Sequence, residues 1–284
     1  VGLMIPYLTL AMTVNVFFIL GAVFVPGLWG SVEMLFPLAL LAFGVLGFLA
    51  LSTFGRFMGR ILAHSFDFEK NNNFNQLTSA MTFSMVAVGF AASAAMSHEK
   101  ATVAVALIGS IFFGVISMLL LVFFGILGMK SILRQGINED TAASLWIFVP
   151  ILTLLGITMT RDIHGIHTLM GEKMVSYMPH FLITTTILSI QIFFLFVGYQ
   201  AMKRIKYIEN YILGDRRTAN VFAIICPGVA LVVFGFFFLH LGLVRNGIVD
   251  KFSLAYFLLL TPLILAQVKT IIVLVIVTKK NIWE

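Results

Sequence analysis

Two histidines three residues apart are the first feature of this sequence that suggests chemistry. His164 and His167 stand in the segment RDIHGIH, and on a helix this spacing places both imidazoles on one face. With a third ligand they could bind zinc or copper, and a pair at membrane depth could hold haem. His98, His180 and His240 are further candidate ligands. The alternative is a loop of hydrogen-bonding or pH-sensitive groups, so both interpretations stay open.

The single cysteine, Cys226, stands directly before Pro227 and Gly228. One thiol excludes a disulfide framework and any structural zinc or iron–sulfur site built from cysteines. Cys226 remains a redox candidate. It also fits a small buried hydrophobe, because no second cysteine is present to resolve an oxidised form.

Two polar residues interrupt long apolar runs. Lys269 lies about ten residues before Lys279, too deep for its side chain to reach that end of a helix easily. An ionisable group inside a membrane suggests function, although Gln267 or a subunit interface offers a structural explanation. Asn15 is either a pore-lining amide or a partner in bonding between helices.

Prolines and one phenylalanine are the remaining pore candidates. Pro6, Pro150 and Pro227 each free a backbone carbonyl, which a membrane protein tolerates where the carbonyl lines a cavity. A simple packing kink is the alternative. Phe234, about two turns after Cys226, is a candidate gate whose ring would swing aside on opening. Because the chain has 29 phenylalanines, packing against lipid or a neighbouring helix is the alternative for this ring.

No catalytic pattern accompanies these residues. The sequence shows no Ser-His-Asp order, no glycine motif that cradles phosphate and no carboxylate pair inside an apolar run. The 12 acidic residues are expected in loops or at the ends of apolar runs. The sequence therefore favours a protein other than an enzyme without deciding the question, and we expect no acidic proton relay through the membrane centre.

The composition places these residues in a membrane protein. Of 284 residues, 60% are apolar and 11% are charged, whereas globular chains carry about 25% charge. Eight runs are long enough to cross about 30 Å of hydrocarbon as helices. They cover approximately 5–29, 32–54, 77–97, 101–128, 143–160, 181–202, 219–245 and 252–278, and the fifth is expected to continue past Arg161. The net charge of +6 reflects loops on one side and does not indicate nucleic-acid binding.

The runs pair into an internal repeat of about 70 residues. Short links join them into four helical hairpins, at approximately 5–54, 77–128, 143–202 and 219–278. Twelve lysines and arginines fall between hairpins or at the C-terminus and five on the opposite side, which predicts a cytoplasmic C-terminus. Because the chain opens on Val1 close to a run, a further N-terminal hairpin is expected before it.

Several stretches resemble the TehA-like tellurite-resistance/dicarboxylate-transporter superfamily, which includes slow anion channels, and especially its TsoY-type (seleno)protein branch. They are LAMTVNVFFILGAVFVPGLW (10–29), AMSHEKATVAVAL (95–107), LWIFVPILTLLGI (145–157), CPGVALVVFGFFF (226–238) and GLVRNGIVDKFSLAY (242–256), together with RDIHGIH (161–167). The resemblance implies a ten-helix, five-hairpin bundle assembled as a trimer. It implies that the first helix of each hairpin is an inner helix, lining a central pore with an aromatic gate. It also implies that Cys226 is the position where selenocysteine can stand in that branch.

The sequence thus predicts an all-α integral membrane protein of the bacterial inner membrane, passing small anions such as sulfur oxyanions or organic acids. No cofactor is expected. One alternative is a membrane redox, metal-binding or haem-binding protein that uses the histidines or Cys226. Another is a structural subunit of a membrane complex.

Overall fold

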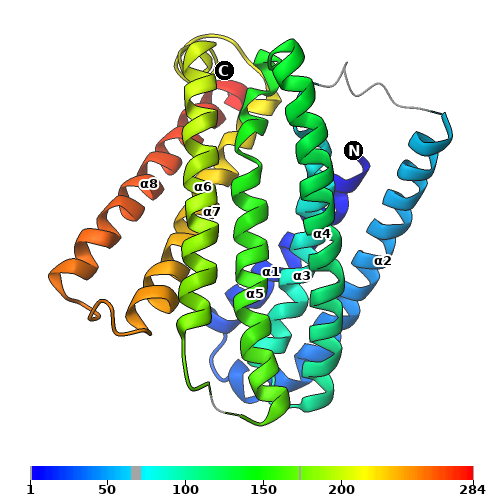
Figure 1. Ribbon diagram of the computed structural model, residues 1–284, viewed down its shortest axis with the longest axis vertical. Coiled ribbons are helices and arrows are strands. Elements are labelled where there is room, and N and C mark those ends of the chain that lie inside the picture. The colour runs from blue at the N-terminus through cyan, green and yellow to red at the C-terminus, as the bar shows by residue number, and fades with distance from the viewer. Residues whose placement is uncertain (1, 65–71, 173, 284) are drawn as a thin grey trace. The chain divides into compact units, whose positions relative to one another are not determined.

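Long helices dominate the computed structural model, which describes residues 2–64, 72–172 and 174–283 (Figure 1). No strand occurs among those residues. The long helices are α1 (Ile5–Phe24), α2 (Val32–His64), α3 (Thr78–Met96), α4 (Lys100–Gln135), α5 (Phe148–Met170), α6 (Met178–Arg204), α7 (Ile225–Phe237) and α8 (Leu254–Thr278).

Eight helical segments of the described chain are long and apolar enough to cross a membrane. They coincide with the eight expected runs, so the prediction of long apolar helices is confirmed, and these helices are compatible with a multi-pass membrane protein. Some helices continue past the apolar runs: α2 carries Arg56 and Arg60, and α4 carries Lys130 and Arg134. These cations were expected in loops, but backbone hydrogen bonding continues into the polar residues. Two other counted cations, Lys70 and Lys173, lie outside the described residues.

The largest difference from the sequence expectation concerns α5. Its helix continues to Met170, as expected for a run that was short for a span. Arg161 and Asp162 therefore lie inside a membrane-spanning helix. The expectation that every acid lies in a loop or at the end of a run is wrong for Asp162, which is 9% exposed.

The helices form two compact units, which are described separately. The first contains Val1–Asp67, Asn75–Ile126 and Ile157–Val175, and the second contains Phe68–Phe74, Leu127–Gly156 and Ser176–Glu284. Helices α4 and α5 contribute to both units, because the division falls within them.

Phenylalanine rings packed against glycines hold α2, α3 and α4 together in the first unit. Each of the three helices places one ring against a glycine of the next, so that α4 packs on α2, α2 on α3, and α3 on α4. The contacts are Phe113 against Gly47, Phe43 against Gly89, and Phe90 against Gly109. Small residues let apolar helices approach closely, and the rings then supply the dispersion contacts that hold them.

This packing predicts that Gly89→Ala destabilises the first unit. The new Cβ would meet the ring of Phe43, and overpacking of this kind costs about 1–3 kcal/mol. Gly55→Ala in α2 is the matched control, because nothing lies within 4 Å of its Cβ position. Thermal unfolding in detergent should show a lower midpoint for Gly89→Ala only. Equal midpoints for the two variants would contradict the packing scheme.

The first helix of each expected pair begins in the same way. A 3₁₀ segment leads directly, or after one residue, into α1, α3, α5 and α7; these segments are Gly2–Met4, Asn75–Leu77, Glu139–Trp146 and Ala219–Ile224. Pro6, Pro150 and Pro227 lie within the first three residues of their α-helices, where the missing N–H costs little. At the starts of α1, α5 and α7 the prolines therefore lie close to the point where the backbone changes from a 3₁₀-helix to an α-helix. The expected position was within the α-helix, where a proline would produce a kink.

Candidate functional site

A charged cluster inside the first unit is the strongest candidate for a functional site. It consists of Arg161 and Asp162 on α5, Ser110 on α4 and the backbone carbonyl of Val88 on α3. Arg161 lies nine residues before the end of α5, or about 14 Å at the rise of an α-helix. Ser110 and Val88 lie about 15 and 12 Å from the corresponding ends of their helices. All three groups are therefore well inside apolar helices.

The two charges of the cluster contact different neighbours. The Ser110 hydroxyl donates to the carboxylate of Asp162, at 2.7 and 2.8 Å from its two oxygens. The Arg161 guanidinium donates through Nη1 to the Val88 carbonyl at 3.1 Å. Successive side chains on a helix point about 100° apart, which explains why adjacent residues reach different helices. Each charge lowers the cost of holding the other away from water.

Arg161 retains hydrogen-bonding capacity that the protein does not use. A guanidinium has five N–H donors, and in the described parts of the chain only the bond to Val88 engages one of them. The residue is largely but not fully buried. A cation with unused donors within an apolar helix can bind an anion through charge-assisted hydrogen bonds.

A second polar group lies in the second unit, where α5, α6 and α7 meet. Gln191 on α6 is fully buried and donates to the Val149 carbonyl at 3.1 Å and to Thr153 Oγ1 at 2.8 Å. Thr153 on α5 donates in turn to the Ala230 carbonyl on α7 at 3.0 Å. The Oε1 oxygen of Gln191 has no partner among the described residues. These hydrogen bonds therefore connect all three helices, and the Oε1 oxygen of Gln191 remains as a buried acceptor without a donor among the described residues.

Phe234 lies one helical turn from this polar layer. Its side chain is fully buried, and its ring packs against Gly156 of α5, where the Ile187 side chain from α6 also lies close. Gly156 follows Thr153 by three residues, and Phe234 follows Ala230 by four, so each pair shares a helix face. The same three helices thus meet in a polar layer and an apolar layer. The ring of the candidate gate sits where a glycine leaves room for it.

The other candidates within apolar runs have different surroundings. Asn15 donates to the Ala11 carbonyl of its own helix at 3.0 Å and to the sulfur of Met85 on α3 at 3.5 Å. Its amide is therefore engaged in bonding within and between helices, the structural alternative given above. Lys269 is exposed on α8, and Cys226 is a free, partly buried thiol in the first turn of α7.

The five candidate histidines fall into both units. His98, His164 and His167 belong to the first, whereas His180 and His240 belong to the second. His164 and His167 lie on the last turns of α5, exposed and half-buried respectively. His240 contacts the Phe236 carbonyl at 3.0 Å and the Tyr256 hydroxyl at 3.2 Å. Among the described residues, no group of three or more His, Cys, Asp or Glu side chains is placed to hold a metal.

Elemental analysis and an absorption spectrum of the purified protein test the metal and haem alternative. That alternative predicts stoichiometric metal or a haem band, lost in the double variant His164→Ala/His167→Ala. A colourless, metal-free protein would leave anion passage as the hypothesis to test.

Comparison with known proteins gives no match, whether with family models, curated proteins or solved structures. The function is therefore inferred from the geometry of the site itself.

Several residues of the candidate sites are not evident from the sequence. The fifth run was expected to continue past Arg161, but Arg161 was counted among the cations of the outward side and Asp162 among the acids in loops or at the ends of runs. Gln191 interrupts an apolar run, as Asn15 does, and that interruption was the available signal. Gly156 and Ser110 carried no signal, because both residue types are common in membrane helices.

Proposed function

We propose that this protein is a multi-pass membrane transporter or channel that passes small anions. The observation that carries the proposal is Arg161, a cation within α5 that has N–H donors the described residues leave unused. These donors can bind an anion through charge-assisted hydrogen bonds, and the neighbouring Asp162 carboxylate offsets part of the positive charge. Asp162 directs its carboxylate at Ser110, and therefore does not occupy the guanidinium donors of Arg161.

The 3₁₀ segments before α1, α3, α5 and α7 fit a chain built from repeated hairpins, but α2 also follows a 3₁₀ segment, Leu28–Gly30, so this start alone does not distinguish the inner helices. Burial fits an inner position for α3 and α5, which are mostly buried, whereas α1 and α7 are mostly not buried. The TehA-like resemblance extends the proposal to a ten-helix bundle, assembled as a trimer.

In this proposal Phe234 is the aromatic gate, held closed on Gly156. The substrates are small oxyanions of sulfur or small organic acids, whose oxygens accept hydrogen bonds from a guanidinium fork. The excess of cations between the expected hairpins and at the C-terminus favours a bacterial inner-membrane protein with a cytoplasmic C-terminus.

An efflux experiment tests the proposal. Liposomes loaded with sulfite, succinate or chloride and containing the purified protein should lose the anion faster than protein-free liposomes of the same lipid. Loss at the rate of the protein-free liposomes for all three anions would contradict the proposed function.

A further inference from the structure

A charged cavity lies at the end of α8 in the second unit. Its volume is about 290 Å³, close to the lower bound for ligand pockets. Its walls come from the turn after α6 and from the end of the last helix. The lining residues are Ile212, Leu213, Gly214, Asp215, Arg217, Ile276, Lys279 and Lys280.

Cations outnumber anions around this cavity. Arg217, Lys279 and Lys280 face one carboxylate, that of Asp215. The Lys280 ammonium donates to the Tyr211 carbonyl at 3.0 Å and to the Gly214 carbonyl, which fixes its charge at the cavity. An ammonium has three N–H donors, so one remains for a ligand. The exposed guanidinium of Arg217 has no hydrogen-bond or ion-pair partner among the described residues.

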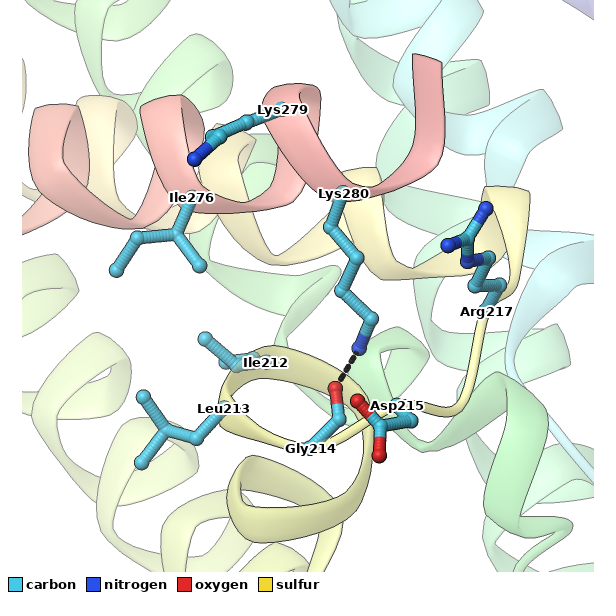
Figure 2. A pocket seen from close by; sticks show the side chains of 8 residues that line it. All are labelled: Ile212, Leu213, Gly214, Asp215, Arg217, Ile276, Lys279 and Lys280. Carbon is cyan, nitrogen blue, oxygen red and sulfur yellow. Dashed lines mark hydrogen bonds between the residues drawn. The ribbon is translucent and has the colours of Figure 1, made fainter. Parts of the chain in front are cut away.

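The cavity has a charged side and an apolar side. Figure 2 shows Lys280 crossing it toward Gly214, with Asp215 and Arg217 on one side and Ile212, Leu213 and Ile276 on the other, where Lys279 lies above Ile276. Leu213 is 70% exposed, and the apolar surface continues along α8 through Ile272 and Val275, which are also exposed. A ligand that fits both sides has an anionic head and a long apolar tail.

The position of the cavity at the ends of the spans also fits such a ligand. Lys279 and Lys280 end a membrane-spanning segment, and Ile212–Arg217 belong to the link between two other spans. The ends of spans lie at the interface between hydrocarbon and water, where phospholipid headgroups sit. The exposed apolar side chains of α8 would then lie beside the acyl chains.

We propose that this cavity binds the headgroup of an anionic phospholipid. The phosphate accepts hydrogen bonds from the Arg217 guanidinium and from the remaining N–H of Lys280, while Lys279 adds positive charge. The acyl chains run outside the cavity, along Leu213 and the exposed face of α8. Lipid binding at this place does not depend on anion passage at Arg161.

Native mass spectrometry of the full chain in detergent tests the proposal with dioctanoyl phosphatidylglycerol and dioctanoyl phosphatidylcholine. The wild type should bind one phosphatidylglycerol at least about fivefold more tightly than phosphatidylcholine, the effect expected for one basic residue at a membrane surface. Arg217→Gln should lose about this factor, and Arg217→Glu more. Arg60→Gln, which removes an exposed arginine near the end of α2, is the matched control and should bind as the wild type does.

Glycerol 3-phosphate distinguishes a lipid from a free phosphate. Its phosphate monoester carries at least as much negative charge as the phosphodiester of the lipid but no acyl chains, so it should displace phosphatidylglycerol only at much higher concentration. Displacement at equal concentration would overturn the proposal in favour of a soluble phosphate site. Equal binding of the two lipids, or unchanged binding in Arg217→Gln, would also overturn it. Thermal unfolding of each variant verifies that the exposed substitutions leave the protein folded.

Discussion

Replacing Arg161 with glutamine is expected to lower anion flux through liposomes by at least about tenfold. At an effective dielectric constant of about 20, a unit charge 5 Å from a monovalent anion contributes about 3 kcal/mol. Glutamine keeps hydrogen-bond donors but removes the charge, so it tests the electrostatic part of the site. Initial efflux rates should be measured at anion concentrations below saturation. Under that condition the rate depends on the affinity of the site for the anion as well as on the rate of passage.

Variants of Asp162 separate flux from folding. Arg161→Gln alone leaves the buried Asp162 carboxylate without its neighbouring cation, so this variant should be less stable than the wild type. The double variant Arg161→Gln/Asp162→Asn removes both charges, so it should recover stability while flux stays low. Asp162→Asn alone keeps the cation and should maintain or raise flux. Arg245→Gln, which removes an arginine at the end of the π-helix Phe238–Val244, is the charge control and should leave flux unchanged. Normal flux in the double variant would contradict the role of Arg161.

Replacing Phe234 with alanine is expected to raise anion flux about tenfold, because the ring would no longer close the proposed pore. A tenfold change corresponds to about 1.4 kcal/mol of barrier, well within what removal of an aromatic ring can supply. The same substitution should destabilise the protein by about 3–5 kcal/mol, since it empties a fully buried site. Both quantities can be measured on one preparation, by efflux and by thermal unfolding.

Two further variants distinguish a gate from a packing residue. Gly156→Ala places a Cβ against the Phe234 ring and should displace it, so flux should rise as it does in Phe234→Ala. Phe236→Ala removes a ring that is 38% exposed on the same helix and should leave flux unchanged. If Phe234→Ala loses stability but conducts at the rate of the wild type, Phe234 is a packing residue and the gate lies elsewhere.

The apolar runs were sufficient to predict the eight helices, because a span must satisfy its backbone hydrogen bonds internally and therefore needs a long apolar helix. The helix ends were less predictable. In α2 and α4 the backbone continues through Arg60 and Arg134, since hydrogen bonding within a helix does not stop where apolar residues do.

The candidate site was harder to predict than the fold. The fifth run was expected to continue past Arg161, but Asp162 was expected at the end of a run, because charged neighbours usually mark such an end. Their burial depends on Ser110 and Val88, which lie 52 and 73 positions away and become neighbours only when the helices pack. Sequence spacing along one helix cannot reveal such partners.

The surroundings of Phe234 were also not predictable from the sequence. Its position on α7 suggested a gate, but 28 other phenylalanines have the same side chain. What distinguishes this ring is its contact with Gly156 on α5, one turn from the hydrogen bond between Thr153 and Ala230. This contact depends on how far α5 and α7 are shifted along each other, and the sequence alone does not predict that shift.

Current measurement across a planar bilayer under a salt gradient tests the central claim, anion passage, most directly. With purified protein and tenfold different concentrations of a sodium salt on the two sides, the reversal potential should lie close to the equilibrium potential of the anion. The double variant Arg161→Gln/Asp162→Asn should carry much less current. A reversal potential at the equilibrium potential of sodium, or current no greater than that of the bare bilayer, would contradict passage of small anions.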